Sequence, residues 1–124
     1  MILATGLDLV EVARIEQDIE RFGDRFVNRI LGPREREVFG RRTDRAIFLG
    51  GRFAAKEAVI KALGYRLTER PSYTEIEIIN NISGRPELEL PDAIRSQLGP
   101  VRCHLSITHE RTHAAAVAII EELS

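Results

Sequence analysis

Apolar positions near the start of the chain change from a strand-like run to a helical spacing. Residues 1–10 are mostly apolar and predict a strand, and Gly6 within it indicates a bulge or a close approach by another backbone or a ligand. Apolar residues then recur every three or four positions, at Val12, Ile15, Ile19 and Phe22. This spacing predicts an amphipathic helix that ends near Gly23.

Two short helices are predicted next. The first closes at Gly32 and is indicated by the apolar residues Phe26, Ile30 and Leu31. Pro33 suits the first position of the second helix, because proline lacks the N–H that this position leaves unused. Residues 40–44 then predict a turn.

A long central helix is predicted from about Arg45 to Leu63, with a stop at Gly64. Thr43 or Asp44 is a suitable residue to cap its start. The pair Gly50–Gly51 weakens the helix locally and allows either a kink or close packing against another backbone.

The second half of the chain is richer in strand patterns. Residues 65–73 contain Pro71 and several polar residues and predict a mobile connection. Residues 74–79 alternate between polar and apolar types and predict a strand, and residues 86–90 predict a second one after a turn. Residues 92–98 predict a short helix between two prolines.

The last segment is predicted to be a hairpin of two strands. In residues 101–108 the apolar side chains alternate with Arg102, His104, Ser106 and Thr108. Residues 113–120 are apolar on both faces, which is typical of a central strand. The chain therefore predicts an α+β fold, with helices packed on a mostly antiparallel sheet, in a single domain of residues 1–124.

Composition excludes several classes of protein. Apolar residues make up 44% and charged residues 30% of the chain, which is typical of a soluble globular protein. The net charge of −1 gives no support for general nucleic-acid binding. No apolar run approaches the ~20 residues of a membrane span, and no signal peptide is evident. The lone Cys103 excludes an internal disulfide, so we expect a cytoplasmic protein.

Arginines are concentrated in the first half of the chain, which indicates a surface for an acidic partner. Acidic residues are interleaved with them, so a solvated face of mixed charge is an equally good interpretation. The arginines in question are Arg14, Arg21, Arg25, Arg29, Arg34, Arg36, Arg41, Arg42 and Arg45.

Three charged residues stand in apolar surroundings. Asp8 lies inside the apolar opening strand, so we expect a cation, a metal or strong donors beside it; capping of the next helix is the alternative. Glu57 and Lys61 are four residues apart on the central helix, so they share one face. Only Lys56 and Lys61 of the 18 basic residues are lysines. Lysine is a point charge that suits a phosphate oxygen, although a surface pair worth well under ~1 kcal/mol is the simpler alternative.

Histidines are clustered near the end of the chain. His104, His109 and His113 lie close to Cys103, but no zinc-binding spacing occurs among them. His109 follows Ser106 and Thr108 at a strand end, where it can bind a phosphate or act as an acid or base; an exposed turn histidine is the alternative. A Ser–His hydrolase is not favoured, because the chain has no G-x-S-x-G turn. Carboxylates, a lysine and this strand end together suit Mg²⁺-assisted phosphate chemistry.

At these residues the chain resembles the holo-acyl-carrier-protein synthases, a family of short 4′-phosphopantetheinyl transferases. The three motifs that carry the resemblance occur in the family's order: Gly6–Glu11 (GLDLVE), Arg52–Lys61 (RFAAKEAVIK) and Leu105–His109 (LSITH). Arg14, residues 26–37 and Gly84-Arg85-Pro86 are also similar to the family. Residues 64–73 depart from it, because family members often have a glycine-rich stretch there.

The resemblance implies a 4′-phosphopantetheinyl transferase fold and a reaction within fatty-acid biosynthesis. Coenzyme A would donate 4′-phosphopantetheine to a serine of apo acyl carrier protein, with release of adenosine 3′,5′-bisphosphate. Asp8 and Glu57 would bind Mg²⁺, and Glu57 would also help deprotonate the serine, directly or through a water on the metal. Lys61 would stabilise the diphosphate and assist the leaving group. The residues that contact the phosphates of coenzyme A would be Arg52, Thr108 and His109, the last of them also with a catalytic role.

The resemblance also implies two kinds of protein partner. Arg14, Arg21 and Arg25 would contact acidic residues on a helix of the carrier protein. Short members of the family assemble as trimers with sites between subunits, so a homotrimer is expected.

Two alternatives remain at this stage: a non-catalytic α+β module that binds an acidic protein, and a phosphohydrolase that breaks down coenzyme A without an acceptor.

Overall fold

Three long strands form an antiparallel sheet with β5 in the centre. The computed structural model describes residues 1–124 and orders these strands as β1 (Ile2–Glu11), β5 (His113–Glu122) and β4 (Val101–His109). Inward and outward side chains alternate along β4, as the sequence predicts. The apolar segment 113–120 is the central strand, which confirms the prediction made from its two apolar faces.

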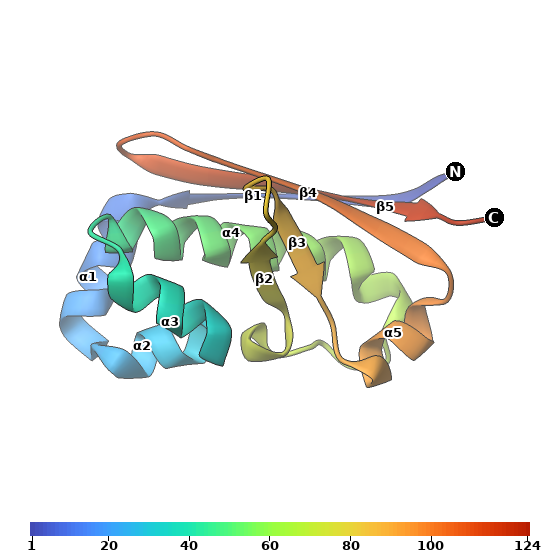
Figure 1. Ribbon diagram of the computed structural model, residues 1–124, viewed down its shortest axis with the longest axis horizontal. Coiled ribbons are helices and arrows are strands. Elements are labelled where there is room, and N and C mark those ends of the chain that lie inside the picture. The colour runs from blue at the N-terminus through green and yellow to red at the C-terminus, as the bar shows by residue number, and fades with distance from the viewer.

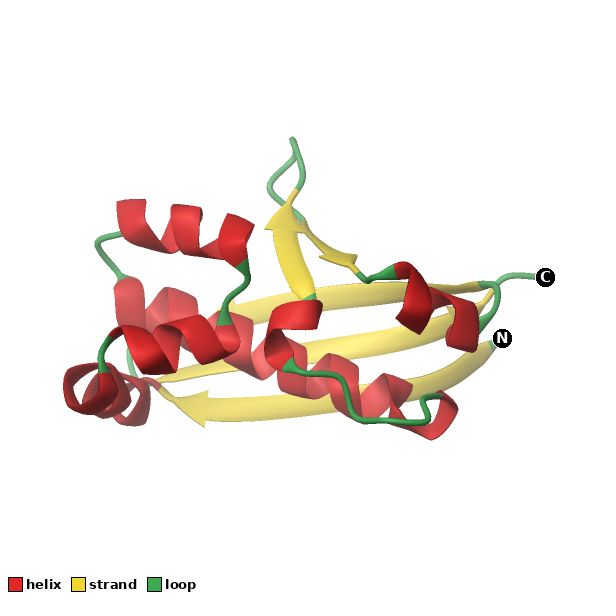
Figure 2. Ribbon diagram, turned by 90° about the horizontal axis from the view of Figure 1, so that it is seen from below, coloured by secondary structure: helices red, strands yellow, loops and turns green.

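All helices lie on one side of this sheet, and the opposite face has no covering layer (Figure 1). The long helix α4 (Arg45–Leu63) packs across the sheet against β1 and β5 (Figure 2). The other helices cover the two ends of α4: α1 (Val12–Phe22), α2 (Asp24–Ile30) and α3 (Pro33–Arg41) at one end, α5 (Asp92–Leu98) at the other. None of the helices has the length and apolar character that a membrane crossing requires.

A second, two-stranded sheet is separate from the first. Its antiparallel strands are β2 (Glu77–Asn80) and β3 (Pro86–Glu89). The chain before β2 forms two short 3₁₀ turns, η1 (Gly64–Arg66) and η2 (Tyr73–Glu75), so the strand predicted over 74–79 begins three residues late. The reason is a local cap, because the Ser72 N–H donates to the Glu75 carboxylate at 2.9 Å and fixes a helical turn there.

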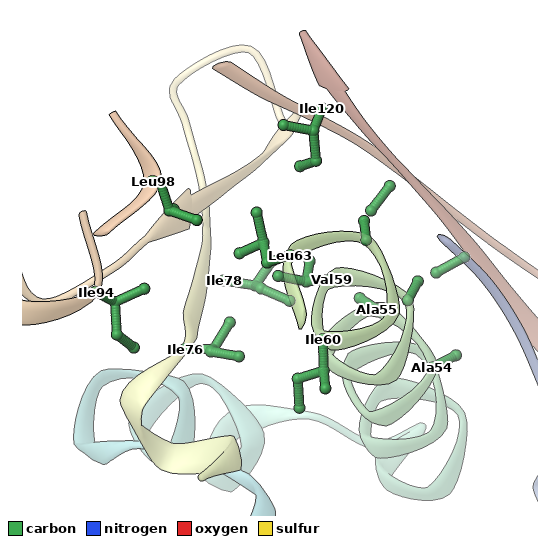
Figure 3. Packing of buried hydrophobic residues seen from close by; sticks show 14 residues of the cluster. Ala54, Ala55, Val59, Ile60, Leu63, Ile76, Ile78, Ile94, Leu98 and Ile120 are labelled. Atoms are coloured by element: carbon green, nitrogen blue, oxygen red, sulfur yellow. The ribbon is translucent and has the colours of Figure 1, made fainter. Parts of the chain in front are cut away.

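The elements on the side of α4 away from the three-stranded sheet form a second layer, which consists of α2, α3, η2, the β2–β3 sheet and α5. The core lies between α4, the three-stranded sheet and this second layer. Side chains of α4 such as Val59 and Leu63 converge with apolar side chains of the neighbouring elements, as Figure 3 shows: Ile76, Ile78, Ile94, Leu98 and Ile120. The face of α4 toward the sheet consists largely of alanine, which lets the helix lie close to the strands.

Two glycine positions permit the close packing of α4. A Cβ on Gly6 would lie 1.9 Å from the Ala58 carbonyl oxygen, so β1 can approach α4 only with glycine there. This confirms the predicted close approach at Gly6. The helix is continuous through Gly50–Gly51, where a Cβ on Gly51 would lie 3.2 Å from the Ile107 side chain. Close packing is therefore the correct alternative there, although the neighbour is a side chain rather than backbone.

Several predicted details differ in the structure. Asp44 occupies the N-cap position of α4, but its side chain does not cap the helix; it forms an ion pair with Arg42 at 2.7 Å instead. Asp8 does not cap α1 either, because the N-cap residue of that helix is Glu11. Phe22, predicted as part of the apolar stripe of α1, is exposed at the end of the helix.

A buried ion pair connects the second layer to α4. The Lys56 ammonium meets the Glu35 carboxylate at 2.6 Å, and both side chains are fully buried. Lys56 also donates to the carbonyl oxygens of Ile30 at 2.6 Å and Tyr73 at 2.9 Å, so its three N–H donors all have acceptors. Burial lowers the pKa of Lys56, and the charge of Glu35 opposes this shift. Glu35 in turn accepts from the N–H of Ile78 in β2 at 3.1 Å.

We predict that Lys56→Met destabilises the fold by about 3–5 kcal/mol, because it leaves the Glu35 carboxylate buried without a cation. Urea unfolding followed by circular dichroism measures the change. Arg34→Met is the control, since it breaks an ion pair with Glu89 in which both side chains are about half exposed; its loss should cost less than about 1 kcal/mol. Equal losses in the two variants would show that the buried pair contributes little.

Candidate functional site

A cavity of about 500 Å³ opens beside α4, where β1 runs into α1. The carboxylate of Asp8 from β1 and that of Glu57 from α4 both line it. The remaining lining comes mainly from the start of α1 and from neighbouring aromatic side chains: Glu11, Arg14, Ile15, Asp18, Phe26, Phe53 and His113, together with Leu9 and Val10. The close approach of β1 to α4 at Gly6 is what brings the two carboxylates to one cavity.

Asp8 has the cation that its apolar surroundings require. Its carboxylate is 17% exposed and accepts a hydrogen bond from the Lys61 ammonium at 3.0 Å. Lys61 also donates to the Leu7 carbonyl oxygen at 3.0 Å, so the lysine lies along β1. The ion pair of Glu57 with Lys61 that the i,i+4 spacing suggests is not formed, because β1 offers Lys61 a closer carboxylate.

Glu57 is held by the segment that precedes β2. The Tyr73 hydroxyl donates to Glu57 Oε1, and Arg70 Nη2 lies 3.4 Å from the same oxygen. Burial raises the pKa of the Tyr73 phenol, and the hydrogen bond to Glu57 raises it further, so the hydroxyl stays protonated at neutral pH. Sequence reasoning missed Tyr73 as a site residue and included it only in the connection predicted over residues 65–73.

The carboxylate pair is suited to a hard divalent cation. Magnesium in proteins is commonly held by one or two carboxylates and completes its coordination with waters and substrate phosphates. The chain has no group of three or more acidic, histidine or cysteine side chains placed to hold a metal, so a cage made of protein ligands alone is not built here. Asp8 and Glu57 therefore fit Mg²⁺ bound together with a phosphate-bearing substrate.

A second cavity, of about 240 Å³, is lined by two of the other predicted phosphate-binding residues, Arg52 and His109. The guanidinium of Arg52 lies 4.7 Å from the centre of the Phe48 ring, and its Nη2 donates to the Asn80 side chain at 3.3 Å. Its buried Nε has no partner, and burial lowers the pKa of Arg52. His109 lines the same cavity. A buried arginine with a free donor favours an anionic ligand at this position.

The predicted site residues thus form two groups on separate cavities. Arg52 and Glu57 are five residues apart on α4, so their side chains leave the helix about 140° apart. Thr108 is exposed on β4 and lines neither cavity. Asn80 is a lining residue that sequence reasoning missed, because only the folding of the β2–β3 hairpin over α4 brings it to Arg52.

The three arginines predicted to bind a carrier protein are all exposed near the first cavity. Arg14 lines this cavity, and Arg25 lines a neighbouring one between α1 and α2 together with Asp18 and Phe26. The guanidinium of Arg21 lies 5.1 Å from the centre of the Phe22 ring. This surface combines positive charge with exposed aromatic edges, which suits an acidic helix.

Cys103 and His104 line neither of the two cavities, whereas His113 is a lining residue of the first one. Cys103 points inward and His104 outward on β4, and burial raises the pKa of the Cys103 thiol to about 11. His104 lies 2.9 Å from Glu121, and His113 lies 3.5 Å from Glu110. The opposite directions of Cys103 and His104 agree with the strand alternation predicted from the sequence.

Comparison with known proteins identifies the family. A family model of the 4′-phosphopantetheinyl transferase superfamily matches residues 4–118. A holo-[acyl-carrier-protein] synthase of Desulfovibrio desulfuricans is 40% identical, covering 99% of this chain and 100% of its own length. One of Marinomonas sp. is 42% identical, covering 98% of each chain.

Solved structures of proteins with the same name have the same fold. The holo-[acyl-carrier-protein] synthase of Neisseria meningitidis superposes with a TM-score of 0.89 at 34% identity, over 98% of this chain and 100% of that one. The Bacillus anthracis protein in complex with CoA (3′,5′-ADP) gives a TM-score of 0.82 at 34% identity, over 99% of both chains. With its carboxylate pair, its α+β fold and full-length relatives of this kind, the chain belongs to the 4′-phosphopantetheinyl transferase superfamily.

Proposed function

We propose that this protein, as one domain of residues 1–124, transfers the 4′-phosphopantetheine group of coenzyme A to a serine of apo acyl carrier protein. The products are the holo carrier protein and adenosine 3′,5′-bisphosphate, and Mg²⁺ is required. The observation that carries the proposal is the pair of carboxylates, Asp8 and Glu57, on one cavity with Lys61 bonded to Asp8. Relatives named for this activity and a relative solved with CoA (3′,5′-ADP) support it.

Each residue has a role that follows from its chemistry. Asp8 and Glu57 would hold Mg²⁺, which when bound would offset the negative charge of the diphosphate. The serine oxygen forms a bond to phosphorus as the phosphorus–oxygen bond within the diphosphate breaks. Glu57 accepts the proton of the serine hydroxyl, directly or through a water. Lys61 lies beside Asp8, where its ammonium neutralises charge on the leaving phosphate.

The second cavity would bind the remaining phosphate of the donor. Arg52 has an unpaired buried donor there, and His109 lines the same space. An anion between these two groups would satisfy the arginine and add a charge-assisted hydrogen bond. Thr108 stands one residue before His109 near the end of β4 and, by strand alternation, points to the uncovered face of the sheet, so its predicted phosphate contact would be made to a ligand on that face.

A site shared between subunits explains why the two groups are separate in one chain. A donor that uses both would bind the carboxylate cavity of one subunit and the Arg52 cavity of the next, in a homotrimer. The uncovered face of the three-stranded sheet supports such an assembly, since Leu7 and Leu9 are about two-thirds exposed on it and pair across the sheet with Val117 and Ala115. Exposed apolar side chains in a continuous sheet face are typical of an interface.

The test is intact mass of an apo acyl carrier protein after incubation with this protein, coenzyme A and Mg²⁺. We expect a gain of one phosphopantetheine, and none when a chelator removes the metal. Asp8→Ala should also give no gain while its circular dichroism spectrum stays native. Carrier binding without a mass gain would favour a non-catalytic module, and breakdown of coenzyme A without an acceptor would favour a phosphohydrolase.

Shared sites predict that two inactive variants restore each other. Asp8→Ala and Arg52→Met damage different cavities, so a trimer that contains both variants has some sites with both cavities intact. Random assembly of equal amounts should give about one quarter of wild-type activity. The carboxylate cavity is intact at half of the sites and the Arg52 cavity at half, so both are intact at about one quarter of them. Co-expression followed by the mass assay measures this. If both cavities of one chain served the same site, the mixture would stay inactive.

Reversal of charge on the arginine surface should weaken carrier binding. We expect Arg25→Glu to raise the KM for the carrier protein by about fivefold to tenfold, with less effect at high salt, because an attraction becomes a repulsion. Arg95→Glu on α5 is the matched control, since Arg95 is also an exposed helical arginine but lies at the other end of α4. A similar rise in both variants would assign the effect to net charge.

A further inference from the structure

Tyr73 is held at both ends by consecutive residues of α4. The Lys56 ammonium donates to its carbonyl oxygen at 2.9 Å, and its hydroxyl donates to Glu57 Oε1. Neighbouring residues of a helix point about 100° apart, so Lys56 and Glu57 reach different parts of one tyrosine. Both contacts are partly buried, and the second one is made to Glu57, which lines the carboxylate cavity.

The ring of Tyr73 is fixed as well. It packs edge-on against Phe53 with 5.4 Å between the ring centres and 67° between the planes. Phe53 lines the same cavity as Glu57. Because Lys56 is itself locked in the buried pair with Glu35, the position of the tyrosine hydroxyl is set by the interior of the protein. A donor placed in this way can orient a side chain that is only partly buried.

The hydrogen bonds of Glu57 are confined to one oxygen. The hydroxyl of Tyr73 and the guanidinium of Arg70 both contact Oε1, and Oε2 has no hydrogen-bond partner. Arg70 contributes less to this arrangement, because its side chain is 59% exposed and its contact is long, at 3.4 Å. We propose that Tyr73 is a positioning residue, whose hydroxyl holds Oε1 so that Oε2 binds the divalent cation.

This inference rests on the proposed metal role of Glu57 and adds to it a residue that does not touch the metal. Carboxylates that bind metals are commonly oriented by a hydrogen bond from a second side chain, and loss of that partner typically weakens metal binding about 10–100-fold. A free glutamate would have to give up rotamer freedom on binding, whereas one fixed by Tyr73 has already done so.

The experiment compares Tyr73→Phe with Tyr65→Phe. Tyr65 is the only other tyrosine, and its hydroxyl contacts Arg66 rather than a residue of the cavity. Binding of Mn²⁺, a paramagnetic substitute for Mg²⁺, is followed by electron paramagnetic resonance in the presence of coenzyme A. We expect about tenfold weaker binding in Tyr73→Phe and a change of less than about twofold in Tyr65→Phe.

Activity gives a second readout that a purely structural role would not produce. In Tyr73→Phe the Mg²⁺ concentration for half-maximal activity should rise about tenfold, while kcat at saturating Mg²⁺ stays within about twofold of wild type. The thermal midpoint should change little, because phenylalanine keeps the ring contact with Phe53. Unchanged Mn²⁺ binding in Tyr73→Phe would overturn the inference while leaving the proposed function intact.

A double variant separates the two proposals. In a Glu57→Ala background the further change Tyr73→Phe should have no added effect on Mn²⁺ binding, because the hydroxyl acts through Glu57. Equal losses from Tyr73→Phe with and without Glu57 would also overturn the inference. Wild-type binding of Mn²⁺ that survives Glu57→Ala at full strength would instead remove the metal role of Glu57, and the role of Tyr73 with it.

Discussion

The buried contact between Lys56 and Glu35 is the constraint on which the arrangement of the layers depends. A carboxylate and an ammonium without access to water are tolerated only when their remaining hydrogen-bonding groups have partners. Here those partners come from α2, α3, η2 and β2, so one pair of charges ties four elements to α4. Any shift of these elements would leave a buried charge or N–H unpaired, which fixes α4 relative to the second layer.

Helix α4 supplies most of the charged side chains of the candidate site, on either side of Lys56. Its alanine face lies on the sheet, and its other faces present Arg52 to the β2–β3 hairpin, Glu57 to Tyr73 and Lys61 to β1. Because one rigid helix holds these charges, their relative directions are set by helix geometry alone. What the helix meets on each side then decides their chemistry: a carboxylate for Lys61, an aromatic ring for Arg52 and a tyrosine hydroxyl for Glu57.

The same geometry gives a reason for an assembly. A helix that directs Arg52 and Glu57 about 140° apart presents them to different cavities of a single chain. The uncovered sheet face beside Asp8, with its exposed leucines, is available for a second copy of the chain. An enzyme built in this way would depend on association for a complete site, so loss of the interface and loss of activity would occur together.

Much of this protein follows from local sequence, and the remainder depends on contacts between distant residues. Periodicity and glycine or proline signals predicted the helices 45–63 and 92–98 and the central strand, and the motifs identified Asp8, Glu57 and Lys61, because these features act over a few residues. The strand predicted over 74–79 was shortened by a cap, and the cation expected beside Asp8 proved to be Lys61, a pairing that arises because β1 comes near α4 only in the folded chain. Three contacts join residues 16 to 28 positions apart: the ion pair of Lys56 with Glu35, the hydrogen bond of Tyr73 to Glu57 and the hydrogen bond of Arg52 to Asn80. Sequence alone determined the candidate side chains for the chemistry; the tertiary structure decided their partners, because a buried charge takes the partner that packing brings to it.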